Sequence, residues 1–251
     1  MLLAIVWAKD LDLTHANIFY TGASFSNISS NKVLFQRHSD SALAGKQWII
    51  GFDPVRARTT SGIGIKFITK SSKFSITFQR ESGYNLFGQF AILIDGQDSK
   101  RINFNPNASG NIKIDYTLPT DGQEHTVEVY LPPFANVSLS KISIDDNSQL
   151  EIQTPAQTQK YLAIGNSISH GMGQHNTIET FPYLLAQANN WDLQNLAVGG
   201  SSTSLTMANM VRDEIPEVHH ITMMYGYNDF YYKEYNVCLL YTSDAADDGL
   251  S

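Results

Sequence analysis

Three short segments of the sequence combine glycine with hydroxyl and amide side chains, and each follows a brief apolar run. They read GNSISHG (residues 165–171), NLAVGGSS (195–202) and YGYNDF (225–230). In an open parallel sheet, ligands bind outside the carboxyl ends of the strands, so segments that follow buried strands are the informative ones. Together the three would supply a hydroxyl, backbone N–H groups made accessible by glycine, and a side-chain amide. Acyl transfer needs that set: a nucleophile, and donors aimed at a developing oxyanion.

Each segment alone also has an ordinary structural explanation. Gly-x-Ser at a strand end is usually a plain turn, and Gly-Gly-Ser-Ser is usually only a loop. Asn-Asp after a strand is usually a turn or a helix cap. The hypothesis of a catalytic site therefore depends on the order of the three segments and on their shared position after strands.

The three segments resemble, in order and spacing, the first three sequence blocks of the SGNH (GDSL) hydrolases, over about residues 160–230. The resemblance implies that Ser167 is the nucleophile of a serine esterase. It also implies that the Gly200 N–H and the Asn228 side-chain amide are oxyanion donors, with the Ser167 N–H as a third. Asn166 stands where the family usually has Asp, and an amide can still shape the nucleophile loop by hydrogen bonding.

The family takes its general base from a late Asp-x-x-His block, in which the Asp orients the His that accepts the serine proton. The printed sequence has no such block between Asn228 and Ser251. We therefore expect a truncated hydrolase domain, a base outside this chain, and little activity from these 251 residues alone. Residues 238–251 resemble translated sequencing-adaptor sequence and are expected to be a non-native tail; the alternative is a genuine polar tail.

Four histidines near the three segments are weaker candidates for the base. His170 lies too close to Ser167 in sequence to be placed freely beside it, and His175 follows in the same segment. The adjacent His219 and His220 point to opposite faces of a strand and do not form a metal pair. With no clustered metal-ligand spacing, we expect neither a metal nor a cofactor.

The elements around these segments alternate between strand and helix. The sequence predicts strands at 160–164, 193–198 and 219–224, and helices at 180–188 and 205–215, the second stopped near Pro216. Pro182 suits the start of the first helix. This order predicts an α/β layer with a mostly parallel sheet.

Residues 17–152 show a different sequence pattern, which predicts repeated short strands and no convincing helix. Side chains at every second position are apolar, which places them on one face of a sheet. The runs are Ile63-Ile65-Phe67, Phe74-Ile76-Phe78, Ile112-Ile114-Tyr116, Val127-Val129 and Ile142-Ile144. Turn-forming residues separate them, which predicts an antiparallel sandwich or jelly roll.

The expected architecture is an all-β, jelly-roll-like sandwich domain followed by a truncated three-layer α/β hydrolase domain with a parallel sheet. The expected boundaries are 1–152 for the sandwich, 153–159 for a polar linker, 160–237 for the hydrolase part and 238–251 for the tail. A sandwich before the hydrolase also resembles two-domain GDSL esterases, including carbohydrate esterases. The motif EVYLPP (128–133) takes part in that likeness, which implies glycan-linked ester substrates.

Composition restricts the partners. A formal charge of −7 and a pI near 5.4 argue against a nucleic-acid binder. No run of about 18 apolar residues predicts a membrane span, and the single cysteine excludes a disulfide framework. The run at 1–8 fits either the end of a secretory signal or a first strand. A secreted or periplasmic location and a cytoplasmic one both stay open, as does the oligomeric state.

Other function classes fit less well. Gly171-Met-Gly173 does not complete a dinucleotide-binding motif, and no Walker-type lysine follows. Ser167 lacks the G-x-S-x-G elbow of α/β-hydrolases. The alternative from a different class is a glycan-binding or adhesion module whose hydrolase part has decayed.

Overall fold

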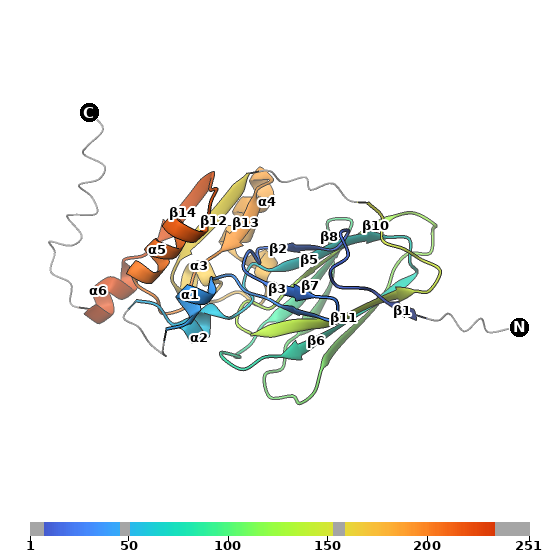
Figure 1. The fold of residues 1–251 in the computed structure, drawn as a ribbon, viewed down its shortest axis with the longest axis horizontal. Coiled ribbons are helices and arrows are strands. Elements are labelled where there is room, and N and C mark those ends of the chain that lie inside the picture. Colours follow the sequence, from blue (N-terminus) through green and yellow to red (C-terminus); the bar gives the residue numbers. More distant parts are fainter. Residues whose placement is uncertain (1–7, 46–50, 153–158, 234–251) are drawn as a thin grey trace, which may run out of the picture.

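The computed structural model describes residues 8–45, 51–152 and 159–233 (Figure 1). Two antiparallel sheets lie at one end of the molecule, and a parallel sheet with its helices lies at the other. The predicted linker at 153–159 falls outside the described residues except for Gln159, as do the tail at 238–251 and residues 1–7. The proposed domain boundaries and the two readings of the first eight residues therefore stay predictions.

The first antiparallel sheet has the order β3-β4-β11-β6-β9, and β1 also pairs with β11. Its strands are β1 (Ala8–Asp10), β3 (Asn27–Ser29), β4 (Lys32–Leu34), β6 (Lys73–Arg80), β9 (Ile112–Thr117) and β11 (Val137–Asp145). The second sheet has the order β2-β5-β10-β7-β8. Its strands are β2 (Phe19–Thr21), β5 (Gly64–Thr69), β7 (Gln89–Ile94), β8 (Gln97–Asn103) and β10 (His125–Tyr130).

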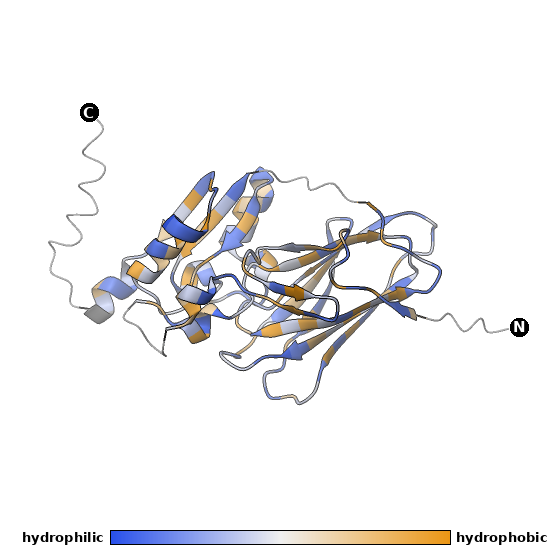
Figure 2. Cartoon of the chain, viewed as in Figure 1, coloured by the Kyte–Doolittle hydropathy of each residue, from blue (hydrophilic) through white to orange (hydrophobic). Residues whose placement is uncertain are grey.

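The inward side chains of the two antiparallel sheets share one apolar core. Ile65 and Phe67 of β5 lie in the same buried cluster as Phe74, Ile76 and Phe78 of β6. Apolar and polar residues alternate along these strands, as the period-two pattern predicts (Figure 2). Burial of apolar surface at about 25 cal/mol per Å² makes this core the main stabilising term of the region.

Two short helices interrupt this region, although the sequence pattern predicts none there. They are α1 (Asp40–Leu43) and α2 (Pro54–Ala57). Side-chain oxygens begin both, because Ser39 accepts from the Ala42 N–H and Asp53 accepts from the Val55 N–H. Four-residue helices are too short for apolar periodicity to reveal them.

The parallel sheet has the order β13-β12-β14 and agrees with the predicted α/β layer. Its strands are β12 (Lys160–Gly165), β13 (Asp192–Asn195) and β14 (His220–Met224). The helices are α3 (Ser167–His170), the 3-10 turn η1 (Thr177–Glu179), α4 (Phe181–Asn189), α5 (Leu205–Glu214) and α6 (Tyr227–Lys233). Strand β13 ends earlier than predicted, yet the next residues still bond to β12, from Leu196 N to Ala163 O and from Val198 N to Gly165 O.

Both faces of β12 are covered. Leu162 and Ile164 pack with Met207 and Met210 of α5, and with apolar side chains of α1 and α2. On the other face, Tyr161 and Ala163 pack with α4 and with residues of β7 and β10. Residues from the first half of the chain therefore enter both cores of the parallel sheet. Within the described ranges, no helix is long and apolar enough to cross a membrane.

A buried arginine connects the segment after β4 to the loop after β13. The Arg37 side chain is 1% exposed and makes five hydrogen bonds to described residues. Its Nη1 donates to Ala197 O at 2.9 Å and also to Asn195 O, while Nε donates to Thr59 O at 2.7 Å. Burial lowers the pKa of Arg37 to about 9, so the guanidinium stays charged at neutral pH.

Replacing this arginine by methionine should destabilise the fold strongly. Arg37→Met keeps much of the apolar stem but leaves buried carbonyl oxygens without donors, and we expect a loss of about 3–5 kcal/mol in unfolding free energy. Urea denaturation of the variant and the parent protein measures this loss. Arg80→Met is the matched control, because the half-buried Arg80 side chain donates to the loop carbonyls of Asn105 and Gly110 and lies over the Phe104 ring, with no bond to the loop after β13 among the described residues. Equal losses in the two variants would contradict the structural role of Arg37.

His38 should make stability depend on pH below neutrality. Its ring is fully buried between Ala57 O and Leu196 O, and burial, followed by the charge of Arg37, lowers its pKa to about 3. The folded state keeps His38 neutral, whereas the unfolded state binds a proton near pH 6.5. The stabilisation is thus complete above about pH 6.5 and is lost as the pH falls towards 3, by at most about 1.4 kcal/mol per pH unit.

Urea denaturation at pH 7.5 and pH 5.0 tests this, with His38→Gln beside the parent protein. We expect unfolding free energy to fall by about 2 kcal/mol more in the parent over this range. His125 changes the pH dependence of stability in the opposite sense, because its hydrogen bond to Asp95 raises its pKa. Both proteins contain His125, so its contribution cancels in the comparison. The same fall in both proteins would refute the assignment.

Candidate active site

The three segments singled out in the sequence meet at the carboxyl ends of the parallel strands. β12, β13 and β14 run in the same direction, so the residues that follow them lie at one edge of the sheet. Backbone hydrogen bonds hold the strand ends together: Asn166 N donates to Met224 O at 3.3 Å, and Val198 N donates to Gly165 O at 3.0 Å.

The first loop turns sharply from strand to helix. Ser167 is the first residue of α3 and is half-buried, so its own N–H has no acceptor within the helix. The Asn166 side chain is buried and accepts from the Ile168 N–H at 3.1 Å, which is the capping role that a carboxylate would also perform. Only glycine fits at 165, because a Cβ there would lie 2.5 Å from Ser169 Oγ.

Asn195 ties the second loop to the first. Its side-chain Oδ1 accepts from the Ala197 N–H at 3.0 Å, and its Nδ2 donates to Ser169 O at 2.9 Å and to Ser61 Oγ at 3.2 Å. The side chain is fully buried. The loop then reaches Gly200, whose φ of 79° lies in the left-handed region that favours glycine.

Ser201 bridges the first and third loops. Its Oγ donates to Gly165 O at 2.9 Å, and its carbonyl oxygen accepts from Asn228 Nδ2 at 2.7 Å. Asp229 adds a link between the third loop and the chain just after the second, because its carboxylate accepts from the Thr203 N–H at 2.9 Å. The structure thus brings the loops of Ser167, Gly200 and Asn228 together. The sequence motifs did not identify Ser201 as a bridging residue. Its position directly after Gly199 and Gly200 is the sequence feature that could have done so.

His170 is a buried, neutral link between the first and second loops. Its Nδ1 accepts from the Gly199 N–H at 2.8 Å, so the proton lies on Nε2, which faces Pro133 O at 2.9 Å and Thr59 Oγ1 at 2.7 Å. Burial lowers the pKa of His170 well below its usual value. Both ring nitrogens are engaged, so this ring has no nitrogen left for the serine proton.

The other nearby histidines lie elsewhere. His219 and His220 are at the start of β14, at the opposite edge of the parallel sheet, where His220 stacks on Trp191. His175 lies in the exposed loop after α3. A general base outside this chain stays a prediction. Among the residues that the structure describes, no three His, Cys, Asp or Glu side chains form a metal-binding group.

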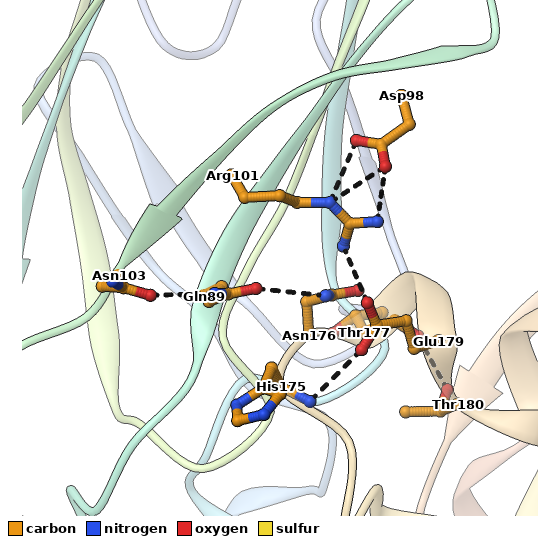
Figure 3. Close-up of polar contacts among 9 residues, drawn as sticks. All are labelled: Gln89, Asp98, Arg101, Asn103, His175, Asn176, Thr177, Glu179 and Thr180. Carbon is orange, nitrogen blue, oxygen red and sulfur yellow. Dashed lines mark hydrogen bonds and ion pairs between the residues drawn. The ribbon is translucent and has the colours of Figure 1, made fainter.

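The loop after α3 is fastened to the β7–β8 hairpin (Figure 3). Gln89 N donates to His175 O at 2.7 Å, and the Gln89 side chain bonds to Asn176 and Asn103. Arg101 lies between Asp98 and Glu179, with its Nη1 3.5 Å from Glu179 Oε1. These contacts fix the chain that leads away from the nucleophile segment.

A cavity of about 250 Å³ lies at the other edge of the sheet. Its walls include the first residues of β12 and β13, Lys160 and Asp192, together with Glu214 at the end of α5. Burial raises the pKa of Asp192, but the cavity is remote in the fold from the three loops. It is therefore separate from the candidate active site.

No family model matches this chain, and no curated protein matches it. Several solved structures, however, are similar to this chain. A salicylyl-acyltransferase from a tetracycline biosynthetic pathway is similar with a TM-score of 0.72 at 21% identity, over 89% of this chain and 63% of that one. A GDSL-like lipase from Bacteroides ovatus is similar with a TM-score of 0.67 at 15% identity, over 86% and 64%.

An acetyl xylan esterase from the rumen bacterium Butyrivibrio proteoclasticus is similar with a TM-score of 0.60 at 14% identity, over 92% of this chain and 67% of that one. The chain thus spans less than two thirds of the length of the first two structures. At these identities the likeness concerns the fold, and the parallel sheet with its three loops agrees with it. The chain has the fold of the SGNH/GDSL esterases.

Proposed function

We propose that this chain belongs to an ester hydrolase that works through an acyl-enzyme on Ser167. The observation that supports it best is the pair of hydrogen bonds made by Ser201, which bring the loops of Ser167 and Asn228 to one sheet edge. In the proposed reaction, Ser167 Oγ attacks the acyl carbon and its proton passes to a general base. The alcohol leaves with that proton, and water then attacks the acyl-enzyme and releases the acid.

The oxyanion that forms in each step needs donors already in place. We assign the Gly200 N–H and the Asn228 amide to this role, with the Ser167 N–H as a third donor. Asn228 is 7% exposed, and one amide hydrogen binds Ser201 O, which fixes the plane of the group and leaves its second hydrogen for the substrate. Donors held in this way cost no reorganisation when the negative charge develops.

The proposed substrate is an ester carried by a glycan, with acetyl as the simplest acyl group. The similar acetyl xylan esterase supports it, together with the resemblance to two-domain carbohydrate esterases. Acyl transfer to another alcohol is the second candidate, because an acyltransferase is among the similar structures. The two differ only in whether water or an alcohol resolves the acyl-enzyme, and product analysis with an added acceptor alcohol separates them.

The general base, the domain division and the location are part of the same proposal. The base would come from an Asp-x-x-His block, and residues 1–152 would form a jelly-roll-like sandwich domain. The proposed location is secreted or periplasmic, with a cytoplasmic one as the alternative. Hydrolysis by the 251 residues alone should stay near background if the base lies elsewhere. Robust turnover by these residues, lost in Ser167→Ala, would instead identify a base among them, with His175 the first to test.

Ser167→Ala should abolish hydrolysis of p-nitrophenyl acetate by the full-length gene product. The variant removes the nucleophile, and residual catalysis from binding and the oxyanion donors is only about 10³–10⁴ over water. Circular dichroism and the melting temperature check that the fold is intact. A kcat within tenfold of the parent value would reject Ser167 as the nucleophile.

Asn228→Ala should lower kcat by about 10²–10³ with a much smaller change in KM, because the amide acts on the transition state. The matched control is Asn189→Ala, whose amide donates to Leu185 O at the exposed end of α4. Steady-state kinetics on the same ester measures both. An effect confined to KM would reassign Asn228 to substrate binding.

A further inference from the structure

We propose that Arg56, in the short helix α2, is a positioning residue that orients the Gly200 N–H toward the substrate. The inference rests on the proposed function, because it concerns one of the assigned oxyanion donors. Its basis is a contact between residues far apart in sequence: Arg56 Nη1 donates to Gly199 O at 3.0 Å.

The Gly199 carbonyl and the Gly200 N–H belong to the same peptide group. That group is trans and planar, so its C=O and N–H point in opposite directions. A hydrogen bond that fixes the Gly199 oxygen on one side therefore fixes the direction of the Gly200 N–H on the other. Gly199 is buried and Gly200 is half-buried, in agreement with a carbonyl that faces the interior.

Two consecutive glycines need such a restraint more than other residues do. Without side chains, both can adopt many backbone conformations, and the peptide between them can rotate at little steric cost. Gly200 already has a φ of 79°. An external anchor thus selects one orientation of this peptide from several that the chain alone would permit.

A second anchor holds the other side of Gly199. Its N–H donates to His170 Nδ1, so both backbone groups of this residue are bound, one by imidazole and one by guanidinium. A Cβ at Gly199 would meet His170, Phe134 and Arg56 as its nearest neighbours, which shows how closely they surround it. His170 also ends α3, the helix that Ser167 begins, so the same contacts set the donor relative to the nucleophile.

The guanidinium of Arg56 is itself held in place. Its Nε forms an ion pair with Asp53 Oδ2 at 3.2 Å, and its Cζ lies 5.1 Å from the centre of the Tyr84 ring. Asp53 is buried and begins α2 by accepting from the Val55 N–H at 2.9 Å. A positive charge at the carbonyl end also polarises the peptide and strengthens its N–H as a donor.

The test compares Arg56→Ala with Arg58→Ala in the full-length gene product. Arg58 lies two residues further on and its side chain donates to Pro54 O and Leu43 O, so it controls for damage to α1 and α2. We expect Arg56→Ala to lower kcat for p-nitrophenyl acetate by about 10–100-fold, less than the loss of a donor, with KM changed less than about threefold. Arg58→Ala should stay near the parent.

Two further readouts separate positioning from general stability. Millimolar guanidinium chloride should restore part of the lost kcat in Arg56→Ala and none in Asn228→Ala, because only the first variant leaves a guanidinium-shaped site. Hydrogen–deuterium exchange should become faster at residues 196–202 in Arg56→Ala and stay unchanged there in Arg58→Ala. This second readout does not need catalysis.

The exchange result keeps this inference distinct from the proposed function. Unchanged exchange at 196–202 in Arg56→Ala would overturn the inference whatever the activity, and so would an unchanged kcat. If Ser167→Ala hydrolyses the ester as fast as the parent, the proposed function fails. Faster exchange would then leave Arg56 as a loop anchor and overturn its role in orienting an oxyanion donor.

Discussion

Buried backbone carbonyls impose the main constraint on this structure. The loop from Asn195 to Gly199 passes through the interior, and interior carbonyl oxygens need donors, because leaving one unpaired costs about 1–3 kcal/mol. Val198 O has a donor from its own neighbourhood, the Ser201 N–H, but the other carbonyls bind donors from far along the chain. Arg37, His38 and Arg56 supply those donors from the first quarter of the chain. The loop that carries Gly200 is thus shaped by residues that the three sequence motifs do not include.

That constraint also explains why the two halves of the chain interlock. Apolar residues of α1 and α2 share a core with β12 and α5, and residues of β7 and β10 share another with α4. A buried guanidinium can stay charged there only because its donors all find oxygen acceptors. The polar contacts therefore select one arrangement of the loops, while the apolar contacts supply most of the stabilisation.

The sequence predicted the α/β layer well, because its strands and helices are long enough to show their periods. The predicted helices at 180–188 and 205–215 match α4 and α5 to within a residue at either end. Local motifs likewise located the three loops at one sheet edge. By contrast, Arg37 and Arg56 have no local signature, since the loop carbonyls that they bind, Ala197 O and Gly199 O, lie more than a hundred residues away. Such long-range polar contacts arise only from the folded topology.

The central claim is that Ser167 lies at a prepared acyl-transfer site, and covalent trapping tests it most directly. The full-length gene product would be treated with an activated alkyl phosphonate, which forms a tetrahedral adduct on an activated serine, and the modified peptide mapped by mass spectrometry. The account predicts one adduct, on Ser167, that excess ester substrate suppresses. An adduct on another residue, or none under conditions in which the protein hydrolyses the ester, would contradict it.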